Sequence, residues 1–263
     1  MDLPTELVLK LAGRSLEAIS LGDSGATVWR CTSEHAPALF LKAAPIAAKL
    51  KLEDEAHRLR WMKAHDLPVP GVREHGRIAG IEYLLVEEVP GTPASAQEWT
   101  LLRPQVVRAL GEGLASLHQT DTSECPFDCR LATQIANARR RIAAGQVRED
   151  DFDEIRAGRS TTALFAELVS SVPDSEELVF VHGDYCLPNI ILQQAADGEV
   201  QVAGLIDCGR AGIADRHQDL ALALRSITCN IGSEWVQPFF EAYGLTHPNP
   251  EKLRFFTLLD EFF

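Results

Sequence analysis

The clearest indication of the fold lies in residues 178–189, which read LVFVHGDYCLPN. The four apolar residues at the start predict a short buried strand, which ends directly before the polar triplet that finishes with Asp184. Asn189 closes the stretch, and a second apolar run at 205–209, LIDCG, places Asp207 directly after another strand. An intervening hairpin should return Asp207 to the cleft that holds Asp184.

These three polar side chains suit the transfer of a phosphoryl group to a hydroxyl. Such a reaction needs a carboxylate that orients the hydroxyl and accepts its proton, and oxygen ligands for a magnesium ion between the phosphates. We predict that Asp184 is the catalytic base and that Asn189 and Asp207 are the magnesium ligands. The Asp-x4-Asn spacing matches the catalytic loop of protein kinases, and the Asp-x-Gly at 207–209 matches their metal motif. We interpret His182 as a structural residue held by hydrogen bonds.

A kinase site also needs a lysine for the phosphates and a helical glutamate that holds the lysine. Lys42 ends the apolar run at 39–42, and a helix is expected over 48–64. At about 100° per residue, Glu55 falls inside the apolar stripe of that helix. A buried acid requires a cationic partner, so we predict that Glu55 pairs with Lys42. In the alternative, Glu55 lies at the edge of the stripe and reaches water.

Residues 22–27, GDSGAT, form a glycine-rich turn between two predicted strands. We predict that this turn, with Ser24 in it, lies over the phosphates of a nucleotide and binds them through backbone amides. An ordinary hairpin turn explains the same residues equally well. The segment differs from the glycine-rich loop of protein kinases, and the chain contains no Walker A sequence.

The order of the predicted elements indicates an α+β fold with two lobes. Residues 1–90 read as paired strands with one helix and form an N-terminal nucleotide-binding lobe. Residues 91–263 read mainly as helices and form a C-terminal catalytic and substrate-binding lobe, and a connector at 87–91 joins the two. Strands are predicted at 26–31, 38–42, 71–77, 82–89, 178–182, 190–193 and 200–206, and helices at 48–64, 104–120, 131–144, 161–171, 215–229, 233–243 and 250–262.

Composition narrows the classes of partner. The chain has 38 acidic and 25 basic residues, a formal net charge of −13. This charge argues against nucleic acid, because phosphate binding requires basic patches, and it favours cationic ligands. The chain shows no signal peptide and no apolar run long enough for a membrane, and its six cysteines are scattered without metal-binding spacing. We expect a cytoplasmic protein with reduced, mostly buried thiols and no membrane partner. The sequence makes no prediction of oligomeric state.

Two acidic features point to the kind of acceptor. Residues 149–154, EDDFDE, pack five carboxylates into six positions, and a solvated helical or loop face would explain them as well. The segment 258–263, LLDEFF, places two acids at the negative end of a predicted helix, where the macrodipole disfavours them. A polycationic ligand would offset such locally unfavourable charges.

Together these motifs make the chain similar to the aminoglycoside 3′-phosphotransferases, the kanamycin and neomycin resistance kinases. The resemblance implies a protein-kinase-like bilobal fold, a magnesium nucleotide cofactor (ATP or GTP, with Mg²⁺) and the 3′-hydroxyl of an aminoglycoside as nucleophile. It is carried by HGD-x4-N at 182–189, IDCGR at 206–210, ADR at 214–216, CPF at 125–127 and LLDEFF at 258–263.

The resemblance also implies roles for single residues. Asp184 resembles the catalytic base, and Asn189 and Asp207 resemble the magnesium ligands. Lys42 and Glu55 resemble the phosphate-binding pair. The backbone at Glu87 and Val89 resembles the hinge that binds adenine. The family's drug-binding positions are matched by Asp151, Asp153, Glu154, Arg210, Asp260, Glu261 and the carboxylate of Phe263.

Two alternatives stay open. The chain could be a kinase of the same fold that acts on another hydroxylated molecule, such as choline, a homoserine-like amino acid or a macrolide, although none of these needs two anionic clusters. It could also be a nucleotide-binding module that has lost catalysis. The presence of Lys42, Glu55, Asp184, Asn189 and Asp207 together argues against that, because drift should have changed at least one of them.

Overall fold

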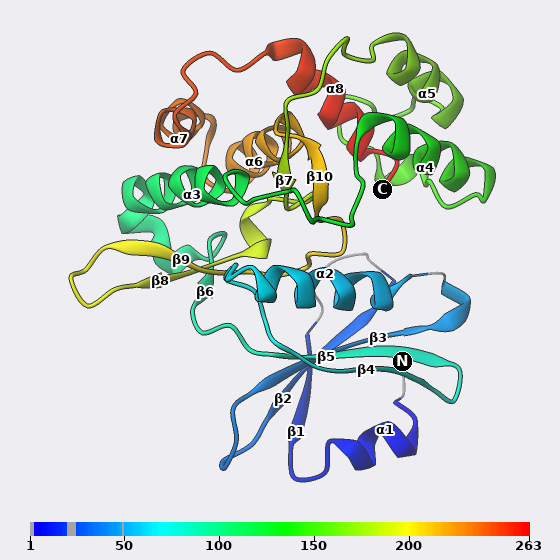
Figure 1. The fold of residues 1–263 in the computed structure, drawn as a ribbon, viewed down its shortest axis with the longest axis vertical. Helices are drawn as coiled ribbons and strands as arrows, with labels where there is room; N and C mark the ends of the chain where they lie inside the picture. Colours follow the sequence, from blue (N-terminus) through cyan, green and yellow to red (C-terminus); the bar gives the residue numbers. More distant parts are fainter. Residues whose placement is uncertain (1–2, 20–24, 49) are drawn as a thin grey trace. The chain divides into compact units, whose positions relative to one another are not determined.

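The computed structural model describes residues 3–19, 25–48 and 50–263. The chain divides into two compact units. The first comprises Met1–Gly91 together with Ala203–Gly209, and the second comprises Thr92–Val202 together with Arg210–Phe263. The first unit is rich in strands and the second is mainly helical, which confirms the α+β class expected from the sequence (Figure 1).

An antiparallel sheet forms the centre of the first unit, with five strands in its described part in the order β1-β2-β3-β5-β4. Trp29 and Cys31 on one strand and Leu39 and Leu41 on the next are buried together, because side chains two residues apart share a face of the sheet. The strands are β1 (Ser15–Ile19), β2 (Thr27–Thr32), β3 (Leu39–Pro45), β4 (Val72–Ile78) and β5 (Ile81–Glu87), and the helices are α1 (Thr5–Lys10) and α2 (Leu52–Ala64), the latter after a 3₁₀ turn at Ile46–Ala48.

Helix α2 packs on β4 and β5 (Figure 1). Its buried residues are Leu52, Glu55, Ala56, Leu59 and Met62, which recur every three or four positions. Helical spacing places such residues on one face, so this face covers the sheet. Glu55 is the single acid on this buried face and therefore lies inside the unit rather than in water.

The second unit contains six α-helices in its described residues, and apolar side chains from four of them meet in one core. Phe152, Leu164, Phe255, Phe256 and Phe262 are all buried in that core. The helices are α3 (Arg103–His118), α4 (Leu131–Ala143), α5 (Thr161–Ser170), α6 (His217–Asn230), α7 (Val236–Tyr243) and α8 (Pro250–Asp260).

Two small sheets accompany these helices. Strands β7 (Leu178–Val181) and β10 (Gly212–Asp215) form an antiparallel pair, visible beside α6 in Figure 1. Strands β6 (Thr92–Pro93), β8 (Ile190–Gln194) and β9 (Val200–Leu205) form the other sheet, in the order β6-β8-β9. Short 3₁₀ turns lie at Gln97–Leu102, Glu149–Asp151, Leu187–Asn189 and Ser233–Trp235.

The sequence analysis omitted α1, β6 and β10, and it gave no bounds for the strand before the glycine-rich turn, which is β1. Strand β10 was missed because its residues, Gly-Ile-Ala-Asp, include three with weak strand preference, and pairing with β7 is what makes them a strand. The helix expected from residue 215 consequently begins two residues later, at His217. The segment 203–209, which was expected to be part of the C-terminal lobe, groups with the first unit.

All six cysteines lie within the described residues and carry free thiols. The expectation that most of them are buried is wrong, since only Cys31 and Cys208 are fully buried. Among the helices of the described residues, none combines the length and the apolar character that a membrane crossing would require.

Candidate active site

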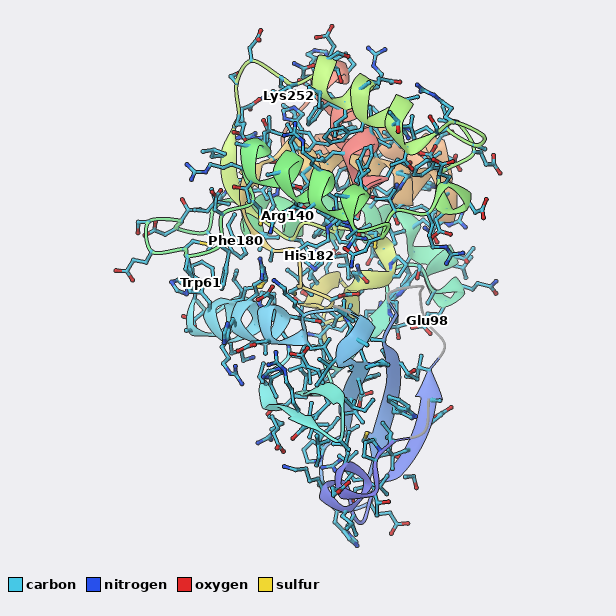
Figure 2. The ribbon with its side chains drawn as sticks, turned by 90° about the vertical axis from the view of Figure 1, so that its right-hand side faces the viewer. Trp61, Glu98, Arg140, Phe180, His182 and Lys252 are labelled. Atoms are coloured by element: carbon cyan, nitrogen blue, oxygen red, sulfur yellow. The ribbon has the colours of Figure 1, made fainter. Side chains whose placement is uncertain are left out.

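The loop that follows β7 presents the carboxylate of Asp184. Figure 2 labels Phe180 in the strand and His182 directly after it. Gly183 adopts φ +83°, and a Cβ there would clash with the backbone oxygen of Arg210, so only glycine fits this turn. The side-chain nitrogen of Asn189 donates to Oδ2 of Asp184 at 2.9 Å and to its backbone oxygen at 3.1 Å. Asn189 therefore fixes the carboxylate of Asp184 from within the same loop.

Helix α6 holds this loop in place through Asp219. The backbone N–H groups of His182 and Gly183 donate to the two oxygens of Asp219 at 2.7 and 2.8 Å, and the His118 ring lies 3.2 Å from one of them. The hydroxyl oxygen of Ser226, two turns further along the same face of α6, accepts the N–H of Leu187 at 2.9 Å. Hydrogen bonds from backbone N–H groups to a buried carboxylate are charge-assisted and strong, so the loop is rigidly anchored.

Asp219 and Ser226 were missed by the sequence analysis. Both are buried on α6, in a run that also contains His217 and Gln218 as buried polar residues. The signal was available: an acid on the apolar face of a predicted helix is the same pattern that singled out Glu55. The interpretation of His182 as a structural residue fits its full burial and the bond that its ring Nδ1 receives from the N–H of Asp184.

In the first unit, Lys42 stands between two carboxylates. Its Nζ lies 2.9 Å from Oε2 of Glu55 and 2.9 Å from Oδ1 of Asp207. Burial alone would lower the pKa of Lys42, but the charges of Glu55 and Asp207 outweigh burial and raise it. The lysine is therefore always charged, and the ion pair that the helical pattern predicted for Glu55 is present.

Asp207 is held in an unusual backbone conformation. Its φ of +57° lies in the left-handed region that non-glycine residues seldom adopt, and its side chain is 44% exposed. The preceding residues are fixed within the first unit: the N–H of Leu205 donates to the oxygen of Pro68 at 2.7 Å, and the side chain of Val89 fills the space that a Cβ on Gly204 would need. The strain at Asp207 thus sits at the end of a well-anchored segment.

The predicted adenine hinge follows the end of β5. The N–H of Glu87 donates to the oxygen of Gly71 at 2.9 Å, and its carboxylate pairs with Arg73 at 2.9 Å. Val89 packs on Gly204, as described above. Within the described residues the backbone N–H of Val89 forms no hydrogen bond. Ser24, the predicted residue of the glycine-rich turn, lies outside the described residues.

In the second unit, Asp260 is shared by two arginines. Arg210 Nη1 lies 2.7 Å from Oδ1 of Asp260, and Arg225 Nη2 lies 2.5 Å from Oδ2. Burial would lower the pKa of Arg210, yet the carboxylates of Asp260 and then Asp184 raise it. Both oxygens of Asp260 are consequently engaged by protein cations, and Arg225 is a partner that the sequence analysis did not foresee.

Arg141 of α4 holds the segment after α8. Its guanidinium donates to the backbone oxygens of Phe262 at 2.6 Å and Phe263 at 2.8 Å. The guanidinium groups of Arg141 and Arg210 also lie 5.7 and 5.1 Å from the centre of the Phe263 ring, within the range of cation–π attraction. Phe262 is fully buried in the core. This segment is therefore packed rather than frayed.

The acidic run at 149–154 is divided between surface and interior. Asp151 and Glu154 are exposed, and Asp151 pairs with Arg148 at 3.4 Å. Asp153 instead points inward, where its Oδ2 lies 2.6 Å from Arg156 and its N–H donates to Glu261 at 3.2 Å. Burial, and then the neighbouring Asp153, raises the pKa of Glu261 to about 7. The structure thus joins Asp153 and Glu261, two predicted substrate residues from distant parts of the sequence.

The side chains predicted to hold magnesium have suitable donor atoms. Asp207 offers an exposed carboxylate, and Asn189 uses its amide nitrogen toward Asp184, which leaves its amide oxygen directed away from that bond. Carboxylate and amide oxygens are the hard ligands that magnesium prefers. The residues present therefore fit the ion.

Comparison with known proteins identifies the family of the chain. The chain matches the model of the phosphotransferase enzyme family over residues 15–256. It is 42% identical over 256 residues to an aminoglycoside 3′-phosphotransferase of Streptomyces fradiae, with 94% of each chain covered.

Solved structures show the same fold over nearly the whole chain. An aminoglycoside 3′-phosphotransferase of type VIII gives a TM-score of 0.87 at 39% identity, covering 98% of this chain and 97% of that one. An aminoglycoside phosphotransferase of Streptomyces rimosus, solved with ADP and streptomycin, gives a TM-score of 0.81 at 28% identity, covering 97% and 95%. These similarities confirm the expected kinase-like fold. The chain therefore belongs to the phosphotransferase enzyme family and, within it, to the aminoglycoside 3′-phosphotransferase family.

Proposed function

We propose that this kinase transfers the γ-phosphoryl group of magnesium ATP to the 3′-hydroxyl of an aminoglycoside. The observation that carries the proposal is the carboxylate of Asp184, fixed by Asn189 on a loop that Asp219 anchors. A carboxylate held in this way is ready to orient an acceptor hydroxyl without reorganisation. Family membership indicates which acceptor that hydroxyl belongs to.

In this proposal Asp184 accepts the proton of the attacking hydroxyl as the oxygen–phosphorus bond forms, and the nucleoside diphosphate leaves with the electrons of the broken bond. Lys42, kept charged and oriented by Glu55, binds the phosphates of the nucleotide. Asn189 and Asp207 would hold the magnesium ion, which when bound would neutralise charge between the phosphates. The preorganised loop supplies positioning, which is the larger part of catalysis in phosphoryl transfer.

The nucleotide base is assigned to the backbone of the segment 87–89. Within the described residues the N–H of Val89 has no acceptor, so it could donate to a ring nitrogen of the purine. We assign a backbone contact with the base to Glu87 as well. Ser24 and its turn are assigned to the phosphates. A neighbour in the family is solved with ADP, which supports an adenine nucleotide, and GTP is the competing nucleotide in the test below.

The aminoglycoside is assigned to the acidic positions of the second unit. Exposed carboxylates of Asp151 and Glu154 and the Asp153–Glu261 pair would face ammonium groups of the drug, where charge-assisted hydrogen bonds form. Asp260 would act through Arg210, since both of its oxygens are already bound by arginines. Phe263 would pack beside Arg210 at the same place.

Phosphorylation adds negative charge to a drug whose binding depends on its cationic groups, so the proposed activity would confer resistance. The six free thiols accord with a reducing compartment, and we place the activity in the cytoplasm.

The test is an assay of the purified protein with Mg-ATP or Mg-GTP and a matched pair of acceptors, kanamycin and its 3′-deoxy analogue. We expect a singly phosphorylated product from kanamycin, with phosphorus–proton correlation placing the phosphate on the 3′-oxygen, and none from the deoxy analogue. Streptomycin, with which a similar structure was solved, serves as a third acceptor. Turnover of the deoxy analogue, or of streptomycin alone, would contradict the assignment of the 3′-hydroxyl.

A further inference from the structure

Arg156 lies between Asp153 and Glu261, which together form an inward-facing acidic cluster. Its Nη1 is 2.6 Å from Oδ2 of Asp153 and 3.1 Å from Oε1 of Glu261. The side chains are 12% exposed for Arg156, 24% for Asp153 and 3% for Glu261. One guanidinium nitrogen thus binds two carboxylates that come from segments more than a hundred residues apart.

The cluster has little capacity left for another cation. The second oxygen of Glu261 accepts the N–H of Asp153 at 3.2 Å, so Glu261 is bonded on both sides. Within the described residues, Oδ1 of Asp153 is buried and has no hydrogen-bond partner. Two carboxylates share one arginine, and a single acceptor atom is left over.

The same pattern occurs at Asp260, whose oxygens are bound by Arg210 and Arg225. Three arginines therefore neutralise three of the acids that would otherwise attract a polycation. Arg156 differs from the other two, because it lies on the acidic loop itself, only two and three positions from the exposed Glu154 and from Asp153.

We propose that Arg156 is an internal counter-ion that occupies the acidic positions a cationic acceptor would use, and that it thereby limits the affinity for that acceptor. The inference rests on the proposed function, because it assigns Arg156 a role in recognition of the aminoglycoside. A drug ammonium group that binds Asp153 or Glu261 must compete with the guanidinium for the same oxygens. Removing the guanidinium removes that competition.

This role makes a prediction opposite to that of a purely structural arginine. A structural arginine keeps the loop in shape, so its loss weakens substrate binding. A competing arginine costs affinity, so its loss strengthens binding even though the apo protein becomes less stable. The pKa of Glu261, about 7, requires the comparison at pH 8, where the carboxylate is ionised and available to an ammonium group.

The experiment is calorimetric titration of kanamycin into the wild type, Arg156→Gln, Arg156→Lys and Arg159→Gln, all saturated with Mg-ADP at pH 8. Arg159→Gln is the matched control, because Arg159 lies three residues on, pairs with Glu167 at 2.6 Å and takes no part in the cluster. Each variant is also titrated with Mg-ADP alone, which should give the same affinity in all four proteins.

We expect Arg156→Gln to bind kanamycin about tenfold more tightly than the wild type, the scale of one charge-assisted hydrogen bond. Arg156→Lys, which keeps the charge, and Arg159→Gln should stay within about twofold of the wild type. Equal or weaker binding by Arg156→Gln would overturn the inference, as would a gain of the same size in Arg156→Lys. If Arg156→Gln does not fold, the comparison is made between Asp153→Asn and Asp153→Asn/Arg156→Gln, where the double variant should bind more tightly.

The outcomes separate the two proposals. A wild type that binds and phosphorylates kanamycin, combined with no gain in the variants, rejects the role of Arg156 and leaves the proposed function standing. A wild type that neither binds nor phosphorylates any aminoglycoside rejects both.

Discussion

Lys42 and Glu55 form a largely buried ion pair, with 2.9 Å between Nζ and Oε2. The pair joins the middle of β3 to α2, and the same nitrogen reaches Asp207 at 2.9 Å. A lysine that contacts two carboxylates has its position fixed by both of them. Loss of either contact should therefore change how the lysine meets a nucleotide, and the two losses should not be independent.

Lys42→Ala should raise the KM for ATP much more than the KM for the drug, because the side chain is assigned to the phosphates. Glu55→Gln should reproduce part of this effect, since the lysine keeps its charge and loses its orienting partner. Steady-state kinetics on both single variants and the double variant measure the coupling, which we expect to be about 0.5–3 kcal/mol, as for contacting residues. Strictly additive effects would show that the two side chains do not cooperate.

Asp184→Ala should lower kcat by roughly 10²–10⁴, the usual contribution of a positioned base. Its anchoring partners, Asp219 and Asn189, remain in place, so the melting temperature and the affinity for Mg-ADP should change little. Single-turnover kinetics with calorimetry as control provide the measurement. A variant that keeps most of its turnover would remove Asp184 from the mechanism.

The raised pKa of Glu261 predicts that the stability of the fold depends on pH. Its pKa rises from 4.5 in the unfolded chain to about 7 in the folded protein because the side chain is buried beside Asp153. Between these values the folded state binds the proton and the unfolded state does not, so stability falls as the pH rises from about 4.5 to 7, by at most about 3 kcal/mol. Urea unfolding across this range should show the slope in the wild type.

Glu261→Gln should lose that slope, because the amide does not titrate. Glu154→Gln, on the exposed part of the acidic loop, is the matched control and should keep the wild-type profile. Identical profiles in Glu261→Gln and the wild type would mean that Glu261 ionises normally.

Lys252 forms a buried ion pair away from the site. Figure 2 labels this residue, which lies in α8 and is buried, with Nζ 2.8 Å from Asp215 and 3.1 Å from Glu177. Removing one partner of a buried pair leaves an uncompensated charge, so Lys252→Met should lower the free energy of unfolding by about 3–5 kcal/mol at pH 7. Arg254→Met, at an exposed position of the same helix, should change it by less than about 1 kcal/mol.

The same pair should respond to acid. Burial alone would raise the pKa of Asp215, but hydrogen bonds from His217 and Lys252 outweigh burial and lower the pKa to about 2. A lowered pKa stabilises the fold above about pH 4, and this stabilisation is lost as the pH falls toward 2. Chemical denaturation between pH 2 and 5 should show a smaller acid-induced loss in Lys252→Met than in the wild type. Equal losses would indicate that Lys252 does not set the pKa of Asp215.

The parts of the site that could be predicted from the sequence are those governed by local periodicity. Glu55 was found because an acid in the apolar stripe of a helix must be buried, and burial demanded a cation within reach. Asp184 and Asp207 were found because each lies two or three residues after the end of an apolar strand. The two strands themselves were recognised by composition, and their boundaries by the polar residues that end them.

Long-range partners could not be predicted in this way. Nothing local to Asp260 indicates Arg225, and nothing local to Glu261 indicates Arg156, because each pair is brought together by the packing of α8 against other elements. Strand β10 was not predicted for the same reason, because pairing with β7 rather than strand propensity makes its residues extended. The acids near the end of the chain were correctly recognised as unusual, but their internal counter-ions belong to the tertiary structure.

The membership of Ala203–Gly209 in the first unit has a consequence for biosynthesis. During translation, residues up to Gly91 leave the ribosome long before this segment exists. Until it arrives, the oxygen of Pro68 lacks the N–H of Leu205, and Lys42 lacks the contact with Asp207. N-terminal units usually fold first during synthesis, but here the first unit is complete only after Ala203–Gly209 has been made. All strands in the described part of the first unit's sheet precede Gly91, so the sheet can pair early, whereas the contacts of Leu205 and Asp207 form only much later in synthesis.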